Sequence, residues 1–170
     1  MNKNLVFIVS IEERGCGFGS AKRGHFFIDY SKPSWKHWCE RHDADLFVLN
    51  ELPPALKNIP ATYCRYFIDQ ILDFHQKEFE QVAIIDSDII THWNSPDFFE
   101  LNNKNFSAVL DNGYYDFIIE SIKLAQGYFP KIEIDWTKYI NAGFLIFNPR
   151  DKAQVQVFKE MQNFILENKE

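Results

Sequence analysis

The stretch that decides the fold is Gln81-Val82-Ala83-Ile84-Ile85-Asp86-Ser87-Asp88-Ile89-Ile90. Its run from Val82 to Ile85 is too short for a helix and rich in β-branched residues, which predicts a buried central strand. Side chains two residues apart in an extended chain point to the same side, so we expect Asp86 and Asp88 to share a side at or just past the strand's end. Because adjacent carboxylates repel each other, the pair predicts a bound cation. Mn²⁺ or Mg²⁺ held by carboxylates usually also binds the phosphates of a substrate.

An Asp-x-Asp sequence also occurs as a simple polar turn that closes a strand. The position of this pair favours a binding role, because ligands of open α/β sheets gather beyond the carboxyl ends of the strands. His92 has the same parity as Asp86 and Asp88, so an extended chain would bring it to their side. His92 is therefore a candidate additional metal ligand, with a surface or loop position as the alternative.

Composition bounds the class of protein. The chain has 170 residues, of which 46% are hydrophobic and 25% charged, as expected for one globular domain. Its net charge of −6 argues against nucleic-acid binding, which needs a basic face to neutralise phosphates. A small phosphorylated ligand remains compatible with this charge, because a metal ion can supply the positive charge.

The cysteines and the amino terminus carry little functional signal. Cys16, Cys39 and Cys64 form no C-x-x-C pair, so neither a disulfide framework nor a zinc site is indicated. The apolar run at the start is short and leads into Glu12-Glu13-Arg14, so we interpret it as the first strand and not as a signal peptide. No run is long enough to span a membrane. We therefore expect a cytoplasmic protein without a transmembrane segment.

Hydrophobic periodicity predicts alternating strands and helices in one layered α/β domain. The predicted strands are Leu5–Ile11, Asp45–Asn50, Val82–Ile85, Phe106–Leu110 and Tyr139–Asn148. The predicted helices are Ser31–His42 with Pro33 near its first turn, a long helix from Ala61 to Phe79, a short helix within Tyr114–Trp136 that helps to cover the cleft, and an amphipathic helix from Lys152 to the end.

Three sets of side chains are predicted to face the core. The first helix presents Trp35, Trp38 and Cys39, and the last presents Val157, Met161, Phe164 and Ile165. The long helix presents Tyr63, Phe67, Ile71 and Phe74, widened by Cys64, Ile68 and Leu72. Arg65 lies off this stripe, where it is either solvated or in reach of a phosphate.

Two glycine-containing segments differ in how well they suit ligand binding. The loop from Gly15 to Gly24 breaks the spacing of a dinucleotide fingerprint, and Asn50 stands where an acidic ribose contact is expected, which argues against a dehydrogenase. Asn141, Ala142 and Gly143 offer an amide and a closely approachable backbone, which suit a sugar or phosphate. The alternative for that segment is a bulge at the start of a strand.

Ala83–Asp88, followed downstream by Tyr139–Pro149, resembles the GT-A fold of nucleotide-sugar glycosyltransferases. The closest resemblance is to glycosyltransferase family 8, the group of glycogenin and the lipopolysaccharide galactosyltransferases. It implies a GT-A domain over residues 1–170 with a mixed, mostly parallel central sheet flanked by helices. It also implies a metal-dependent transferase that moves a sugar from a nucleoside-diphosphate sugar, with a UDP-sugar favoured, to the hydroxyl of a carbohydrate or glycoconjugate acceptor, with retention of configuration.

The resemblance assigns roles by position. Asp86-Ser87-Asp88 matches the D-x-D motif that binds Mn²⁺ or Mg²⁺ and, through it, the donor diphosphate. Arg65 matches a basic residue near the phosphates, and Ser10 lies at the strand end that binds the nucleotide base. Asp111 and the Asn141–Gly143 segment match residues beside the sugar.

The sequence also departs from the family pattern. It ends at Glu170 without a further Asp-Gln pair and a His-x-x-Gly-x-x-Lys-Pro-Trp segment, so we expect a catalytic domain that lacks the usual C-terminal segment. A non-catalytic nucleotide-sugar-binding domain and a nucleotidyltransferase remain alternatives. The latter normally carries its basic glycine-rich loop directly after the first strand, whereas here Glu12-Glu13 intervenes.

Overall fold

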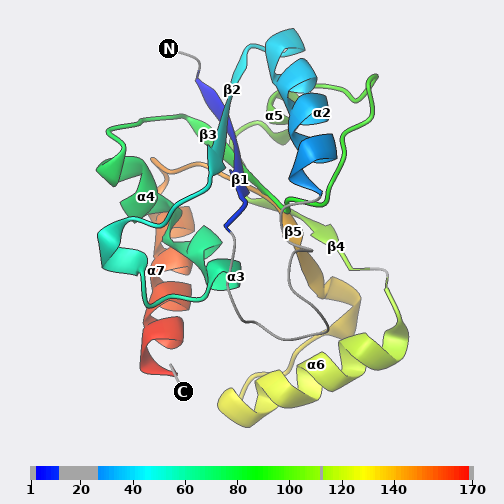
Figure 1. The fold of residues 1–170 in the computed structure, drawn as a ribbon. Helices are drawn as coiled ribbons and strands as arrows, with labels where there is room; N and C mark the ends of the chain where they lie inside the picture. The colour runs from blue at the N-terminus through cyan, green and yellow to red at the C-terminus, as the bar shows by residue number, and fades with distance from the viewer. Residues whose placement is uncertain (1–2, 12–26, 112, 169–170) are drawn as a thin grey trace.

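The computed structural model describes residues 3–11, 27–111 and 113–168. The glycine-rich loop lies outside these residues, and so does Cys16. A five-stranded sheet in the order β2-β1-β3-β5-β4 forms the centre of the fold (Figure 1). Its strands are β1 (Asn4–Val9), β2 (Ala44–Leu49), β3 (Gln81–Ile85), β4 (Ser107–Leu110) and β5 (Ile140–Phe147).

The pairing of the strands makes the sheet mixed but mostly parallel. β1 pairs in parallel with both β2 and β3, whereas β5 runs antiparallel to β3 and to β4. Four strands therefore point in one direction and β5 alone is reversed. This confirms the predicted sheet, and the five predicted strands match the observed ones to within two residues at either end.

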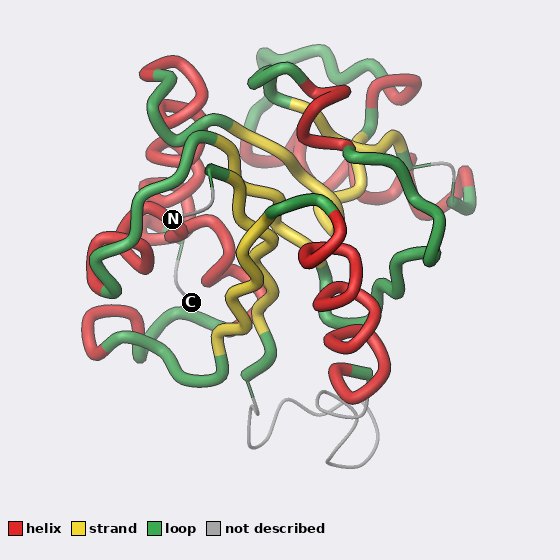
Figure 2. The backbone as a smooth tube through the Cα atoms, turned by 90° about the horizontal axis from the view of Figure 1, so that it is seen from above, coloured by secondary structure: helices red, strands yellow, loops and turns green. Residues whose placement is uncertain are grey.

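Helices cover both faces of the sheet (Figures 1 and 2). The helices are α2 (Ile28–Arg41), α3 (Ala61–Cys64), α4 (Ile68–Phe74), α5 (Phe98–Asn102), α6 (Tyr115–Tyr128) and α7 (Lys152–Glu167). Short 3₁₀ turns add η1 (Pro54–Leu56), η2 (Arg65–Phe67) and η3 (Trp136–Lys138). Among the described residues, no helix combines the length and apolarity needed to cross a bilayer.

The strands alternate between two cores, one on each face of the sheet. Leu5 and Phe7 of β1 pack with Ile71 of α4 on one face. Val6 and Ile8 pack with α2 on the other. All four β1 side chains are fully buried, which explains why the strand reads as a continuous apolar run.

Helix α2 begins three residues before the predicted start, so Pro33 lies inside the helix and not in its first turn. The ring there removes one backbone N–H, whose partner would be the carbonyl of Asp29 near the helix start. Trp35, Trp38 and Cys39 are buried against the sheet as predicted. Burial raises the pKa of the Cys39 thiol to about 12, so the thiol stays protonated at neutral pH.

The predicted long helix from Ala61 to Phe79 is wrong, because it breaks into α3, η2 and α4 and ends at Phe74. The carbonyl of Tyr66, at the break, accepts a hydrogen bond of 2.7 Å from Gln162 Nε2 of α7. This tertiary contact competes with helix continuation. Tyr63 and Phe74 were predicted to face the core but are 47% and 58% exposed, whereas the other five members of the predicted stripe are at the core.

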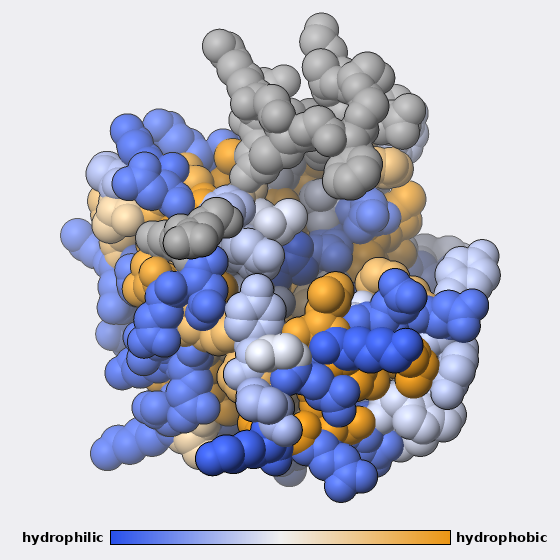
Figure 3. All heavy atoms as spheres, turned by 90° about the horizontal axis from the view of Figure 1, so that it is seen from below, coloured by the Kyte–Doolittle hydropathy of each residue, from blue (hydrophilic) through white to orange (hydrophobic). Residues whose placement is uncertain are grey.

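The inward face of α7 matches the prediction in part: Met161, Phe164 and Ile165 are half-buried, and Ile165 packs against the core. Phe158 and Gln162 are its buried residues, and Val157 is exposed. Gln162 faces inward because its side chain bonds the Tyr66 carbonyl and, at 2.8 Å, Asp69 Oδ1. The underside of the molecule, where α6 lies lowest in Figure 1, presents apolar side chains among hydrophilic ones (Figure 3).

Truncation of α7 side chains tests this face. Phe158 lies 4.3 Å from Phe147 between ring centroids and is 2% exposed. We expect Phe158→Ala to lower the free energy of unfolding by about 3–5 kcal/mol in a urea titration, because the lost ring leaves a cavity. Val157→Ala is the matched control and should cost at most about 1 kcal/mol. Equal losses of unfolding free energy in the two variants would instead support Val157 as a core-facing residue, as the sequence predicts.

Candidate active site

A bulge in β5 shapes the edge of the sheet where the predicted site residues gather. Ala108 of β4 pairs with Leu145 of β5, but the next residue, Val109, pairs with Asn141. One step along β4 thus corresponds to four along β5, which leaves Ala142, Gly143 and Phe144 as a bulge. Bulges re-aim side chains and backbone groups, often beside active sites. The alternative of a bulge in this segment, left open by the sequence, is what the structure contains.

Antiparallel pairing with β3 brings Gly143 against Asp86, because Ile85 pairs with Phe144 and the next step along the ladder joins Asp86 to Gly143. The Asp86 backbone N–H donates to the Gly143 carbonyl at 2.9 Å, and the Gly143 N–H donates to Asn141 Oδ1 at 2.7 Å. A Cβ atom at position 143 would lie 2.6 Å from Asp86 Oδ2 and 2.8 Å from Asn141 Oδ1. Only glycine fits this contact without displacing a polar side chain.

Arg65 joins Asp86 from the other side. Its guanidinium forms an ion pair with the Asp86 carboxylate and donates to the Ala142 carbonyl at 3.1 Å. Its Nε donates to the Thr62 carbonyl at 3.1 Å, which fixes the stem of the side chain. The Arg65 and Asp86 side chains are only 16% and 34% exposed, so water screens the pair less than at an open surface. Arg65 thus places a positive charge at the carboxyl end of β3.

Tyr66 is a site residue that the sequence reasoning missed. Burial raises the pKa of its phenol, and the nearby Arg65 offsets part of this rise, while Asp86 adds to it. The phenol therefore stays protonated at neutral pH, and its ring packs against the core next to Arg65 in the chain. The sequence held no signal for this, because Tyr66 lay outside both motifs and outside the predicted helix stripe.

After Asp86 the chain turns at once. The Ile89 N–H donates to the Asp86 carbonyl at 3.1 Å, which closes a four-residue turn over Asp86-Ser87-Asp88-Ile89. Because the chain is not extended here, the alternation of side chains along a strand does not carry over to Asp88 or His92. The Asp88 side chain is exposed at the tip of this turn.

Helix α2 holds the turn from behind. Ser31 Oγ donates to the Ser87 carbonyl at 2.6 Å, and Trp35 Nε1 donates to the Ile89 carbonyl at 2.8 Å. A third contact follows at Thr91, whose N–H donates to Ser34 Oγ at 3.2 Å. The position of the Asp86–Ile89 turn therefore depends on a helix more than fifty residues earlier in the chain.

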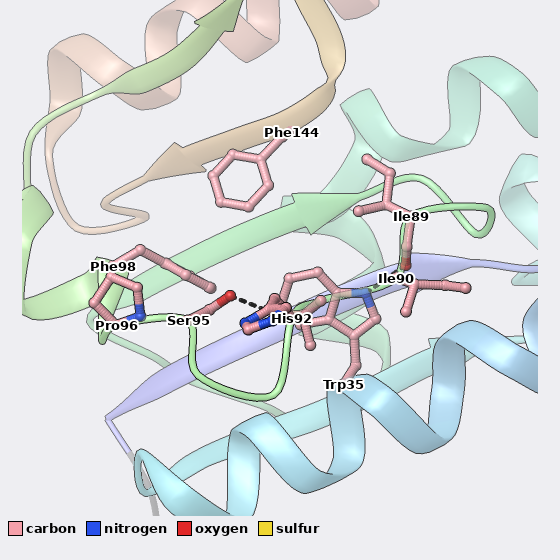
Figure 4. A pocket seen from close by; sticks show the side chains of 9 residues that line it. Trp35, Ile89, Ile90, His92, Ser95, Pro96, Phe98 and Phe144 are labelled. Carbon is pink, nitrogen blue, oxygen red and sulfur yellow. Dashed lines mark hydrogen bonds between the residues drawn. The ribbon is translucent and has the colours of Figure 1, made fainter.

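The turn carries two carboxylates, Asp88, which is exposed, and Asp86, which is paired with Arg65. Within the described residues, no group of three or more His, Cys, Asp and Glu side chains is placed to hold a metal ion. His92 does not join Asp86 and Asp88. It lies beside Trp35 and Phe144 instead (Figure 4). Mg²⁺-type ions are commonly held by one or two carboxylates, with substrate phosphates and water completing the shell, so the pair fits such an ion.

Ser10 and Asp111 lie at the same edge of the sheet. Ser10 follows β1, and its N–H donates to the Leu49 carbonyl at 2.9 Å. Its hydroxyl is buried and hydrogen-bonds to no described residue. Asp111 follows β4, where its N–H donates to the Tyr139 carbonyl and its carboxylate accepts from the Gly113 N–H at 2.8 Å. The predicted residues thus gather at the carboxyl ends of β1, β3 and β4, beside the β5 bulge.

Comparison with known proteins places the chain among the glycosyltransferase enzymes. The model of glycosyl transferase family 8 matches residues 28–170, and the chain belongs to this family. A glycosyltransferase involved in the glycosylation of the major capsid of PBCV-1 has a similar structure, with a TM-score of 0.56 and 12% sequence identity over 97% of this chain and 68% of that chain. At this identity the likeness shows the fold alone. Comparison with curated proteins gives no match.

The contact between Gly143 and Asp86 can be tested by glycine substitution. We expect Gly143→Ala to lower the free energy of unfolding by about 1–3 kcal/mol, because the added methyl group must displace Asp86 or Asn141. Gly127→Ala is the control, since a Cβ there meets nothing within 4 Å, and its helical position should raise stability by up to about 1 kcal/mol. A neutral Gly143→Ala variant in urea unfolding would contradict the tight contact.

Proposed function

We propose that this family 8 enzyme transfers a sugar from a UDP-sugar to a hydroxyl of a carbohydrate or glycoconjugate acceptor, with retention of configuration. One observation carries the proposal. The Asp86–Ile89 turn, Arg65 and the Asn141–Gly143 segment, which are far apart in sequence, meet at the carboxyl end of the sheet in a chain of this family. This is where an open α/β sheet binds its ligand.

The proposed reaction builds up negative charge on the departing diphosphate. Mn²⁺ or Mg²⁺ bound by Asp86 and Asp88 would supply positive charge to that leaving group. Arg65 contributes a second positive charge, and its bonds to Ala142 and Thr62 hold it in place before substrate binds. Preorganised charges of this kind lower the barrier because they need no rearrangement during the reaction.

Other residues would bind and orient the donor. The buried Ser10 hydroxyl has an unused hydrogen-bonding capacity among the described residues, which a nucleotide at the end of β1 would satisfy. Asp111 follows β4, and Asn141 lies near the start of the neighbouring strand β5. Both side chains therefore lie at the same edge of the sheet, where they can orient the sugar. Tyr66 adds a neutral phenol near Arg65.

Thermal unfolding tests the donor and the metal together. We expect UDP with Mn²⁺ to stabilise the chain by roughly 2.7 kcal/mol at about 100 times the dissociation constant. For a domain of this size each kcal/mol raises the midpoint by about 2–4 °C. UDP or Mn²⁺ alone should give a smaller rise. A GDP response equal to that of UDP would contradict the proposed donor class.

Asp88→Ala should abolish the Mn²⁺-dependent part of this stabilisation and leave the midpoint of the ligand-free protein nearly unchanged, because Asp88 is exposed on a turn. Asp116→Ala, an exposed carboxylate in the first turn of α6, is the control for loss of one negative charge. Unchanged UDP affinity in the presence of Mn²⁺ in the Asp88 variant would remove this residue from the metal site.

Arg65→Lys keeps the charge but loses the planar fork that bonds Asp86 and Ala142 together. We expect the rate of sugar transfer to fall by about 10²–10³, the usual effect of removing one preorganised donor. Donor hydrolysis and transfer assays with saturating UDP-sugar and Mn²⁺ would measure it. A variant as active as the parent would show that Arg65 serves only the fold.

A further inference from the structure

A hollow of about 320 Å³, open to solvent on one side, lies on the α2 side of the sheet beside the segment that follows the Asp86–Ile89 turn. We call it the Phe144 cavity; its walls are Trp35 of α2, Phe98 of α5, Phe144 of β5, and Ile89. Figure 4 shows the Phe144 ring on one side of this space and Trp35 with Ile89 on the other. The volume is at the lower end of the range for small-molecule sites, enough for one ring with a substituent.

The aromatic walls of the cavity are fixed by contacts behind them. Phe98 stacks on Trp38 with centroids 4.1 Å apart and planes within 7°, and it meets Phe144 edge-on at 5.3 Å. Trp35 is 2% exposed, and its indole N–H is bound to the Ile89 carbonyl. Asp97 caps α5 through the N–H groups of its first turn and so fixes Phe98. A ligand would meet walls that are already in place.

The polar groups of the cavity define the chemistry of a ligand. Thr91 and Ser95 hydroxyls satisfy each other at 3.3 Å. His92 Nδ1 accepts the Asn94 N–H at 3.1 Å, so the neutral imidazole carries its proton on Nε2, which is then a hydrogen-bond donor. The other lining side chains are mainly aromatic and aliphatic, so an uncharged ring would bury apolar surface against them. A single oxygen acceptor on that ring could accept a hydrogen bond from His92.

Two walls of the cavity are sequence neighbours of the proposed donor site. Ile89 follows Asp88, and its N–H closes the turn onto the Asp86 carbonyl. Phe144 follows Gly143, whose carbonyl holds the Asp86 N–H. A ring lodged between Ile89 and Phe144 would support both segments from the opposite face of the sheet.

We infer that the Phe144 cavity is a binding site for a small uncharged aromatic or alicyclic compound with one oxygen acceptor, and that its occupation steadies the Asp86–Ile89 turn. The site is distinct from the edge of the sheet where Arg65, Asp86 and Gly143 meet. Only its effect on UDP binding rests on the proposed function.

Fluorine NMR of 4-fluorophenol with the full chain tests the site directly. We expect saturable binding, and weaker binding of fluorobenzene, which lacks the oxygen. Ser95→Phe should fill the cavity and weaken 4-fluorophenol binding by about tenfold or more. Trp93→Phe is the control, because Trp93 is 70% exposed and lies outside the cavity walls. His92→Phe, an exposed position that should not disturb folding, should bring the two ligands to similar affinity.

Amide hydrogen exchange tests the effect on the turn. Saturating 4-fluorophenol should slow exchange at Ile89 and Thr91, whose N–H groups bond Asp86 and Ser34. It should also tighten UDP binding in the presence of Mn²⁺ by about fivefold. No saturable binding, or equal binding in a folded Ser95→Phe variant, would overturn the site. Unchanged exchange would overturn its effect on the turn. Failure of UDP to bind at all would contradict the proposed function, but it would not affect the inferred ligand site or its effect on the Asp86–Ile89 turn.

Discussion

The antiparallel pairing of β3 with β5 is the constraint on which the site depends. The register is regular as far as Ile85 and Phe144, and its next step joins the Asp86 N–H to the Gly143 carbonyl. β4 leaves this register at the three-residue bulge, where the Ala142 carbonyl accepts a hydrogen bond from Arg65. The Phe144 ring packs on the α2 side of the sheet, as the alternation of side chains along a strand requires. One strand therefore supplies backbone contacts to the proposed donor site and an aromatic side chain to the other face.

Two layers of the fold hold the Asp86–Ile89 turn from opposite directions. On one face, Arg65 connects η2 to the carboxylate of Asp86. On the other, Ser31 and Trp35 of α2 bind the carbonyls of the turn. Catalytic groups need this kind of support, because small displacements weaken both electrostatic stabilisation and substrate alignment. The family 8 chain thus uses its central sheet to position a short polar turn between two helical layers.

Sequence patterns identified the strands well because they are short apolar runs, and β1 and β3 at the centre of the sheet are buried on both faces. They failed where a distant contact overruled local preference. The helix from Ala61 is interrupted at η2, where Gln162 bonds the Tyr66 carbonyl. The same bond places Gln162 on the buried face of α7, where Val157 was expected. Hydrophobic periodicity assigns a glutamine to the surface, so it does not predict the buried position of Gln162.

The sequence by itself determined the five strands, the position of the Asp-x-Asp motif at a strand end, and the resemblance to the glycosyltransferases. These depend on local residue types and spacing. Only the tertiary structure decided that the chain turns at Asp86, that Arg65 pairs with it, and that His92 lies beside an aromatic hollow away from the carboxylates. The turn is held by α2 from more than fifty residues earlier, and the positions of Arg65 and His92 likewise depend on segments distant in the chain, so no local pattern encodes them.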